Sequence, residues 1–200
     1  VAVVALAEAC VIACRRLLAF LALAVAAARV DAVEAAKLVP TQSEITFQLK
    51  QSGVPVEGRF KRFDAQLTLE PKAPQTGSVT VTIDTASATV GFADSDAELP
   101  GALWFDAKNY PRAVFRSSAI IGAGGGRFEA KGKFELKGTA RELVVPVTIV
   151  QAGPLSTATG EVTLQRLDYK IGEKEWADLS LVANDVRVRF KLVFTGVGPL

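Results

Sequence analysis

Residues 186–192 read VRVRFKL, a stretch in which apolar and basic residues alternate without a break. Val, Val, Phe and Leu take the even positions, and Arg187, Arg189 and Lys191 take the odd positions. Successive side chains of a β-strand point to opposite faces, so this alternation places one face in a core and the other in water. The stretch therefore predicts a half-buried strand.

The same period of two recurs along most of the chain. Further apolar rows are Ile45, Phe47 and Leu49; Val79, Val81 and Ile83; Phe128, Ala130, Gly132 and Phe134; and Leu143, Val145, Val147 and Ile149. Turn-forming residues separate the rows at Gly77-Ser78, Gly122–Gly126, Lys137-Gly138 and Gly153-Pro154. Because short links join neighbouring strands as hairpins, the pairing is expected to be antiparallel.

These rows predict about eight strands, near residues 43–50, 57–70, 78–85, 112–121, 127–137, 141–151, 158–166 and 178–195. No stretch after residue 28 has a long period of 3.6 residues, so an all-β fold is expected, either a closed barrel or a sandwich. An eight-stranded barrel is just wide enough to hold one small or slender ligand.

Residues 1–28 are typical of a secretory signal peptide. Arg15 and Arg16 precede a twelve-residue apolar run, Leu17–Ala28, which ends in small residues. The run is too short to span a bilayer comfortably, although an uncleaved membrane anchor is the alternative. We expect cleavage after Ala28, or after Ala32, and export to the periplasm. Residues 1–10 lie outside the signal pattern and fit a translation start assigned too far upstream.

The remaining chain is expected to form one domain. A flexible lead-in over 29–40 would precede a barrel domain over 41–196, and 197–200 would form a tail. This length is sufficient to bury a sizeable core without disulfides.

Composition excludes several function classes. The 200-residue chain has no His and no Met, and its two cysteines, Cys10 and Cys14, lie in the expected signal segment. Histidine triads, Cys–His nucleophiles, the usual zinc sites and His- or Met-ligated haem cannot be built from such a barrel, so no metal or cofactor is expected. The formal net charge of +2 gives no electrostatic footprint for nucleic acid.

Residues 85–111 interrupt the strand pattern. Acidic residues and a serine precede an apolar group that includes Trp104 and Phe105, which predicts a short capped helix. Such a segment at one end of a barrel forms either a lid or a plug. The cluster Asp94, Asp96, Glu98 and Asp106 also contains the carboxylates that a hydrolase needs, although helix capping and a solvated rim are the favoured explanation.

Two further features leave alternatives open. The abundant phenylalanines either line an apolar cavity or fill a solid core. Arg166 and Asp168 are expected to form an exposed ion pair beside a polar loop that Trp176 anchors.

Several short motifs occur in a characteristic order: Ser43–Phe47, Gly58–Phe60 with Phe63, Asp96–Leu99, Trp104–Asp106, Tyr110-Pro111, Phe115–Ser117, Gly132–Thr139, Val145–Val147, Arg166–Gly172 and Glu175-Trp176. With these motifs the chain resembles the YceI-like family of exported bacterial proteins, from about Val39 to Phe194. The resemblance implies an eight-stranded antiparallel lipocalin-like barrel with short helical turns at one end. It also implies an elongated apolar tunnel that takes an isoprenoid tail, such as that of a quinone.

The expected function is therefore periplasmic binding, transport or storage of an isoprenoid lipid, without catalysis. The tunnel lining is expected to include Phe47, Phe60, Trp104, Phe105, Phe115, Phe134 and Phe190. Asp96 and Glu98 are expected at the mouth, near the head group. Gln42 and Glu98 stand where the family commonly has His, which removes any head-group contact made through that residue type.

Transient contact with a membrane or a membrane protein is the other partnership expected. The alternative function is a solid-core barrel that acts as an accessory partner of a membrane respiratory protein.

Overall fold

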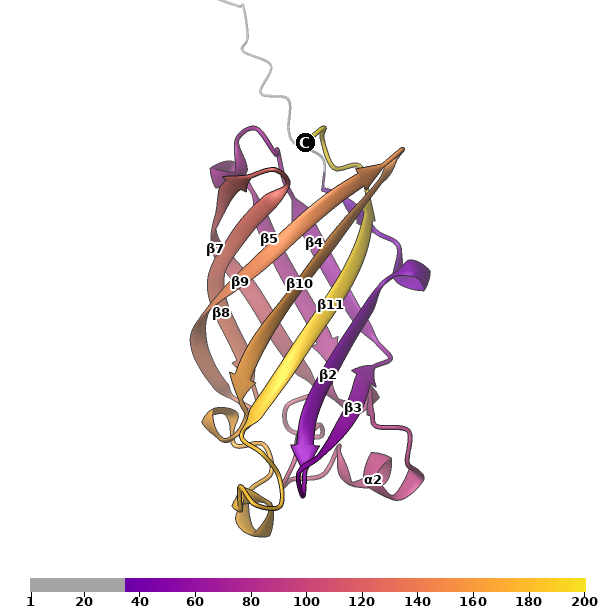
Figure 1. Ribbon diagram of the computed structural model, residues 1–200, viewed down its shortest axis with the longest axis vertical. Helices are drawn as coiled ribbons and strands as arrows, with labels where there is room; N and C mark the ends of the chain where they lie inside the picture. The colour runs from indigo at the N-terminus through magenta and orange to yellow at the C-terminus, as the bar shows by residue number, and fades with distance from the viewer. Residues whose placement is uncertain (1–34) are drawn as a thin grey trace, which may run out of the picture. The chain divides into compact units, whose positions relative to one another are not determined.

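The computed structural model describes residues 35–200, which form one curled antiparallel sheet (Figure 1). Its strands are β1 (Lys37–Leu38), β2 (Glu44–Gln51), β3 (Val54–Phe60), β4 (Phe63–Thr68), β5 (Ser78–Asp84), β6 (Ala88–Thr89), β7 (Arg112–Gly124), β8 (Arg127–Leu136), β9 (Thr139–Ala152), β10 (Leu155–Gln165) and β11 (Asp185–Thr195). The all-β prediction is confirmed. The expected signal segment lies outside the described residues.

The sheet curls until its two ends approach each other. Its strand order is β4-β5-β7-β8-β9-β10-β11-β2-β3-β6, and β1 pairs with the part of β11 that β2 leaves free. The backbone N–H of Ala36, just before β1, donates to the carbonyl of Leu67 in β4 at 2.7 Å. The short strand β1 therefore links β11 to β4 and joins the two sides of the sheet.

The strand count differs from the expected eight. The strand expected over 57–70 is two strands, β3 and β4, because the chain changes neighbours between them: Phe60 pairs with Ala88 of β6, whereas Phe63 pairs with Ile83 of β5. The two-residue strands β1 and β6 were not expected. The lead-in expected to be flexible contains β1, and part of the expected tail is held by Gln151, whose amide donates to the Gly198 carbonyl at 2.7 Å.

Alternation decides which side chains enter the interior. Along β8, every second side chain is buried and every other one is exposed, from Arg127 to Leu136. Phe134 of β8 lies opposite Phe115 of β7, and both are buried. The inner faces of the curled sheet therefore meet in one apolar core, as the period of two predicts.

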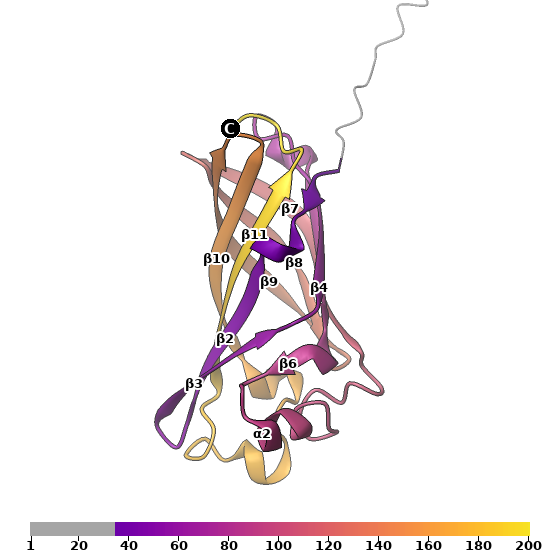
Figure 2. The ribbon, with the colours of Figure 1, turned by 90° about the vertical axis from the view of Figure 1, so that its right-hand side faces the viewer.

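Short helices gather mainly at one end of the sheet (Figure 2). They are η1 (Pro40–Gln42), η2 (Pro74–Thr76), η3 (Thr85–Ser87), α2 (Ala93–Glu98), η4 (Arg166–Tyr169) and η5 (Lys174–Ala177). No helix among residues 35–200 has the length and apolar character needed to cross a membrane.

The two ends of the sheet differ in construction (Figures 1 and 2). The α2 end consists of the β2–β3 turn, residues 84–111, the β8–β9 turn and residues 166–184. The hairpin end consists of residues 69–77, the β7–β8 and β9–β10 hairpins, and residues 196–200. The candidate site lies inside the sheet, between these two ends.

Candidate functional site

An apolar cavity of about 210 Å³ lies within the curled sheet. The seven aromatic side chains predicted to line a tunnel all lie on its wall: Phe47, Phe60, Trp104, Phe105, Phe115, Phe134 and Phe190. Among the described residues that line the cavity, Arg166 alone carries a charge. The cavity therefore accepts an apolar group and offers almost no polar contact.

Aromatic side chains crowd the part of the cavity next to the α2 end. The ring centroids of Phe47 and Phe60 lie 5.3 Å apart, and those of Phe60 and Phe105 lie 5.7 Å apart. Trp104 lies 5.5 Å from Trp176 of η5 by the same measure. Residues 99–111 thus place Trp104 and Phe105 at the cavity wall and bring them against strands and loops distant in sequence.

Two glycines make room for phenylalanine rings on the cavity wall. Gly58 is the cross-strand partner of Phe47, and Gly160 is the partner of Phe190. A methyl group on either glycine would lie closer to that ring than van der Waals contact allows. The missing side chains therefore determine where both rings lie.

Arg166 is buried, and the expected exposed ion pair with Asp168 is wrong. Asp168 instead lies 3.4 Å from an Nη of Arg141. The guanidinium of Arg166 donates hydrogen bonds of 2.6–2.9 Å to the backbone carbonyls of Ala183, Ile171, Gly172, Trp176 and Val182. Burial lowers the pKa of Arg166, yet these carbonyl dipoles surround the cation with acceptors. It holds residues 171–183 over the α2 end of the cavity.

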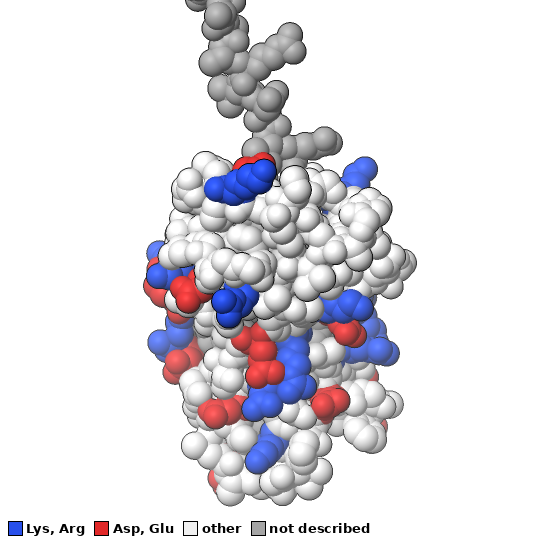
Figure 3. Space-filling model, turned by 45° about the horizontal axis from the view of Figure 1, so that its top comes forward, with Lys and Arg blue, Asp and Glu red and all other residues white. Residues whose placement is uncertain are grey.

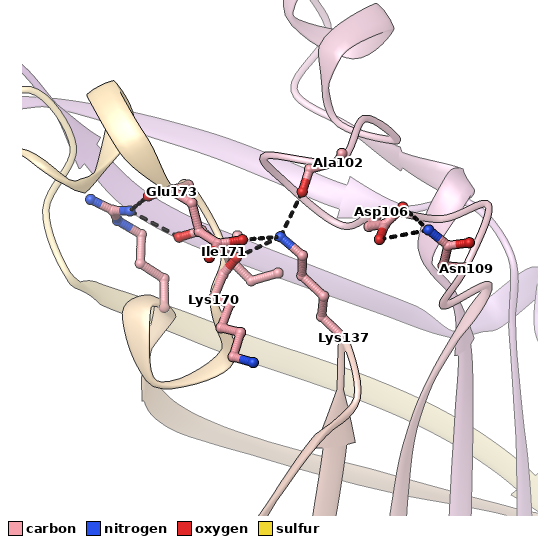
Figure 4. Close-up of polar contacts among 9 residues, drawn as sticks. Ala102, Asp106, Asn109, Lys137, Lys170, Ile171 and Glu173 are labelled. Carbon is pink, nitrogen blue, oxygen red and sulfur yellow. Dashed lines mark hydrogen bonds and ion pairs between the residues drawn. The ribbon is translucent and has the colours of Figure 1, made fainter.

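Lys137 performs a similar role from the β8–β9 turn (Figure 4). Its Nζ donates to the carbonyls of Ala102 and Lys170, each at 2.7 Å, and to Glu173 Oε2 at 2.9 Å. The ammonium thus joins three segments that are distant in sequence. Lys137 and Arg166 together fix the loops that close the α2 end.

The acidic residues predicted at the mouth lie on α2, and neither lines the cavity. Asp96 accepts hydrogen bonds from the Thr89 hydroxyl and, at 2.7 Å, from the Val90 N–H. These bonds, the Thr89 bond first, lower the pKa of Asp96. Glu98 is exposed, as is Gln42 on η1. Asp96 therefore attaches α2 to β6, and a role of either acidic residue toward a head group stays a prediction.

The wider acidic cluster is partly engaged in local contacts. The carboxylate of Asp106 accepts from Asn109 Nδ2, with both oxygens at 3.0 Å (Figure 4). Within residues 35–200, no group of three or more His, Cys, Asp and Glu side chains is arranged to hold a metal. The predicted short helix is present, but its N-cap is Phe92, which makes no side-chain cap.

A model of the YceI-like domain matches residues 37–194, which include all of the strands except the last residue of β11. The chain belongs to the YceI-like family.

Relatives within the YceI-like family cover most of this chain. A UPF0312 protein of Vibrio cholerae is 30% identical over 155 residues, which cover 72% of this chain and 82% of that protein. Protein YceI of Escherichia coli O157:H7 is 27% identical over 110 residues, covering 54% of this chain and 57% of that protein.

Solved structures of similar proteins share the fold. BcnA of Burkholderia cenocepacia is 40% identical with a TM-score of 0.76, and the match covers 78% of this chain and 99% of that one. A polyisoprenoid-binding domain from Saccharophagus degradans, implicated in plant cell wall breakdown, is 14% identical with a TM-score of 0.65. That second match covers 82% of this chain and 99% of the other.

Proposed function

We propose that this YceI-like protein binds the isoprenoid tail of a lipid, such as a quinone, in its interior cavity and performs no covalent chemistry. The observation that carries the proposal is the cavity wall, where ten aromatic side chains, including the seven predicted, lie among aliphatic ones and the single charged group is saturated by carbonyls. A saturated guanidinium has no free N–H with which to polarise a substrate. The wall therefore suits burial of a hydrocarbon chain.

Burial of apolar area supplies the binding energy. Each square ångström of apolar surface removed from water contributes about 25 cal/mol. The cavity of about 210 Å³ exceeds the ~150 Å³ that admits benzene in an engineered protein core, and is smaller than the ~300–1,000 Å³ typical of drug-sized sites. A long tail therefore enters only as aromatic side chains on the wall change rotamer.

A structurally similar protein also supports this proposal. The Saccharophagus degradans domain is described as binding polyisoprenoids, and its fold is similar to this one. Export to the periplasm is supported by the order of Arg15-Arg16, the apolar run Leu17–Ala28 and the small residues that end it. In that compartment the protein would carry or store a lipid that is poorly dispersed in water.

Native mass spectrometry tests the proposal. The chain is expressed with its signal in a bacterial host, recovered from the periplasm and weighed before and after organic extraction. A stoichiometric mass that solvent releases, identified as a prenyl lipid, is the expected result. A chain that arrives empty, and stays empty with added quinones and polyprenyl phosphates, would instead favour a solid-core barrel that binds a membrane protein.

Over-packing of the wall separates a cavity from a solid core. Phe115→Trp and Phe134→Trp each add volume at a buried lining position. If a tail occupies the cavity, both variants fold and take up less lipid; if the core is solid, both are destabilised by about 1–3 kcal/mol. Phe92→Trp is the matched control, because Phe92 is 69% exposed and should leave both properties unchanged.

A further inference from the structure

The hairpin end carries very little charge (Figure 3). Residues 119–126, 148–157 and 195–200 contain no Asp, Glu, Lys or Arg. In the segments that form this end and in β1 beside them, the charged side chains are Lys37, Glu70, Lys72 and Arg127. Protein surfaces normally carry interspersed charges of both signs, so an end with so few charges points to a function.

Contacts between these segments make the end one continuous surface. Leu200 donates its N–H to Gln151 Oε1 at 3.0 Å, which joins the C-terminal residues to the β9–β10 hairpin. A Cβ placed on Gly122 would lie 3.2 Å from Pro74, and one on Gly198 would lie 3.4 Å from Pro71. Residues 69–77, both hairpins and residues 196–200 therefore lie against one another.

Aliphatic side chains project from this surface. Ile121 is 43% exposed, Val150 is 61% exposed and Leu200 is 46% exposed. Exposed apolar residues also occur at the α2 end. Phe92 immediately precedes the acidic helix α2, and Val54, Leu179 and Leu181 are 42–63% exposed at the β2–β3 turn and in the loop before β11. The hairpin end differs in its glycine-rich turn Gly122–Gly126.

We propose that the hairpin end docks on the surface of a phospholipid bilayer. The position at which the described chain begins favours this occupant: Ala36 lies at this end, bonded to Leu67, and the apolar run Leu17–Ala28 precedes it by a few residues. While it is still attached, that run would tether the chain through this end. Shallow insertion of aliphatic residues at the headgroup boundary needs no partner charge.

The composition of the surface argues against a protein partner. Protein interfaces concentrate their binding energy in Trp, Tyr and Arg. The segments of the hairpin end contain no Trp or Tyr, and their one Arg, Arg127, donates to the Gly124 carbonyl of its own hairpin. A lipid surface matches aliphatic residues and glycines better than a folded partner does.

Docking in this orientation serves the proposed function, on which this step rests. Leu69, Ile120 and Ile149 line the cavity, and they lie on the segments that form the hairpin end. A bilayer in contact with this end would lie next to these lining residues. The bilayer is also where an isoprenoid lipid resides, so the surface would bring cavity and ligand together.

Vesicle flotation tests the docking. The whole chain is expressed and processed, its mass is recorded, and it is mixed with phosphatidylcholine vesicles that contain no prenyl lipid. Ile121→Glu and Val150→Glu are expected to weaken binding roughly tenfold each, because a charge must enter the apolar boundary. Val54→Glu is the matched control: Val54 is 63% exposed at the α2 end, and its replacement should leave binding unchanged.

Each other outcome overturns the proposal. Absence of binding by the parent chain would do so, as would equal loss in the Val54→Glu variant. If the mass shows that the Leu17–Ala28 run is retained and Val150→Glu binds as well as the parent, the run alone is responsible. Concentration-dependent self-association that Val150→Glu abolishes without vesicles would assign the surface to a second copy. The vesicles contain no prenyl lipid, so this experiment does not depend on lipid uptake into the cavity. Uptake of a prenyl lipid from detergent, measured separately, tests the proposed function even if docking fails.

Discussion

The Nζ of Lys137 lies 2.9 Å from Glu173 Oε2, and the lysine side chain is 5% exposed whereas that of the glutamate is 45% exposed. The lysine also satisfies the carbonyls of Ala102 and Lys170. Lys137→Met should therefore lower the free energy of unfolding by about 2–3 kcal/mol, since three acceptors lose a charged donor at once. Chemical denaturation measures this change.

An exposed pair on the same hairpin provides the control for that measurement. Lys133 Nζ lies 3.7 Å from Glu142, and both side chains are more than two-thirds exposed. Lys133→Met should change the free energy of unfolding by less than about 0.5 kcal/mol, because water screens such pairs. Similar losses in the two variants would show that Lys137 is not a fastening point of the α2 end.

Arg166 allows a local prediction about the loops at the α2 end. Lysine at this position has one nitrogen and can satisfy at most three of the carbonyls that the guanidinium now satisfies. Arg166→Lys should destabilise the protein by about 2–4 kcal/mol and accelerate amide exchange in residues 171–183 before exchange in the strands. Arg187→Lys is the control, because Arg187 is half exposed and contacts Glu161 only on the outer face. Uniform acceleration across the strands would contradict a local role.

The alternation of apolar and polar residues was sufficient to predict most of the strands and the faces of their side chains. Phe134 and Phe190 were predicted to face inward because each occupies the apolar phase of an alternating run, and that phase determines a face. The prediction of one strand over 57–70 overlooked the break between β3 and β4. The apolar phase shifts from even positions at Phe60 to odd positions from Phe63 on, and at this shift the chain changes its pairing partner from β6 to β5.

The two buried cations were missed for a different reason. Most partners of Arg166 and Lys137 are backbone carbonyls, which every residue carries and which leave no mark in the sequence. A long basic side chain next to a turn reads as exposed by default. The one sequence signal for Lys137 was its position before Gly138 in a predicted turn. The structure places Lys137 in that turn with a positive φ of 47°.

Asp96 gives a pH dependence whose sign follows from its hydrogen bonds. The Thr89 hydroxyl, and after it the Val90 N–H, lower the pKa of Asp96 below its ordinary value of 3.8. A carboxylate with a depressed folded pKa stabilises the fold fully above its unfolded pKa, and this contribution is lost as the pH falls through the folded pKa. Asp96→Asn should thus be less stable than the parent at neutral pH and equal to it in strong acid.

Unfolding midpoints measured from about pH 7 down to about pH 2.5 test this convergence. Asp94→Asn, on the same short helix, is the matched control, because Asp94 is exposed and its replacement leaves the bonds of Asp96 to Thr89 and Val90 in place. A constant offset between Asp96→Asn and the parent at every pH would show that the carboxylate charge plays no part in holding α2 to β6.

Gly160 and Phe190 offer a test of how closely the cavity wall is packed. A methyl group at position 160 would overlap both the Phe190 ring and the carbonyl oxygen of Pro146 in β9, so Gly160→Ala should cost about 1–3 kcal/mol although its backbone angles suit alanine. Adding Phe190→Leu removes the ring but leaves the carbonyl, so rescue should be partial. Gly124→Ala, which meets no atom within 4 Å, should show only the backbone cost of its positive φ of 76°, about 1 kcal/mol. Full rescue by Phe190→Leu would contradict this expectation. It would mean that β9 can move away from β10 far enough to relieve the overlap with the Pro146 carbonyl.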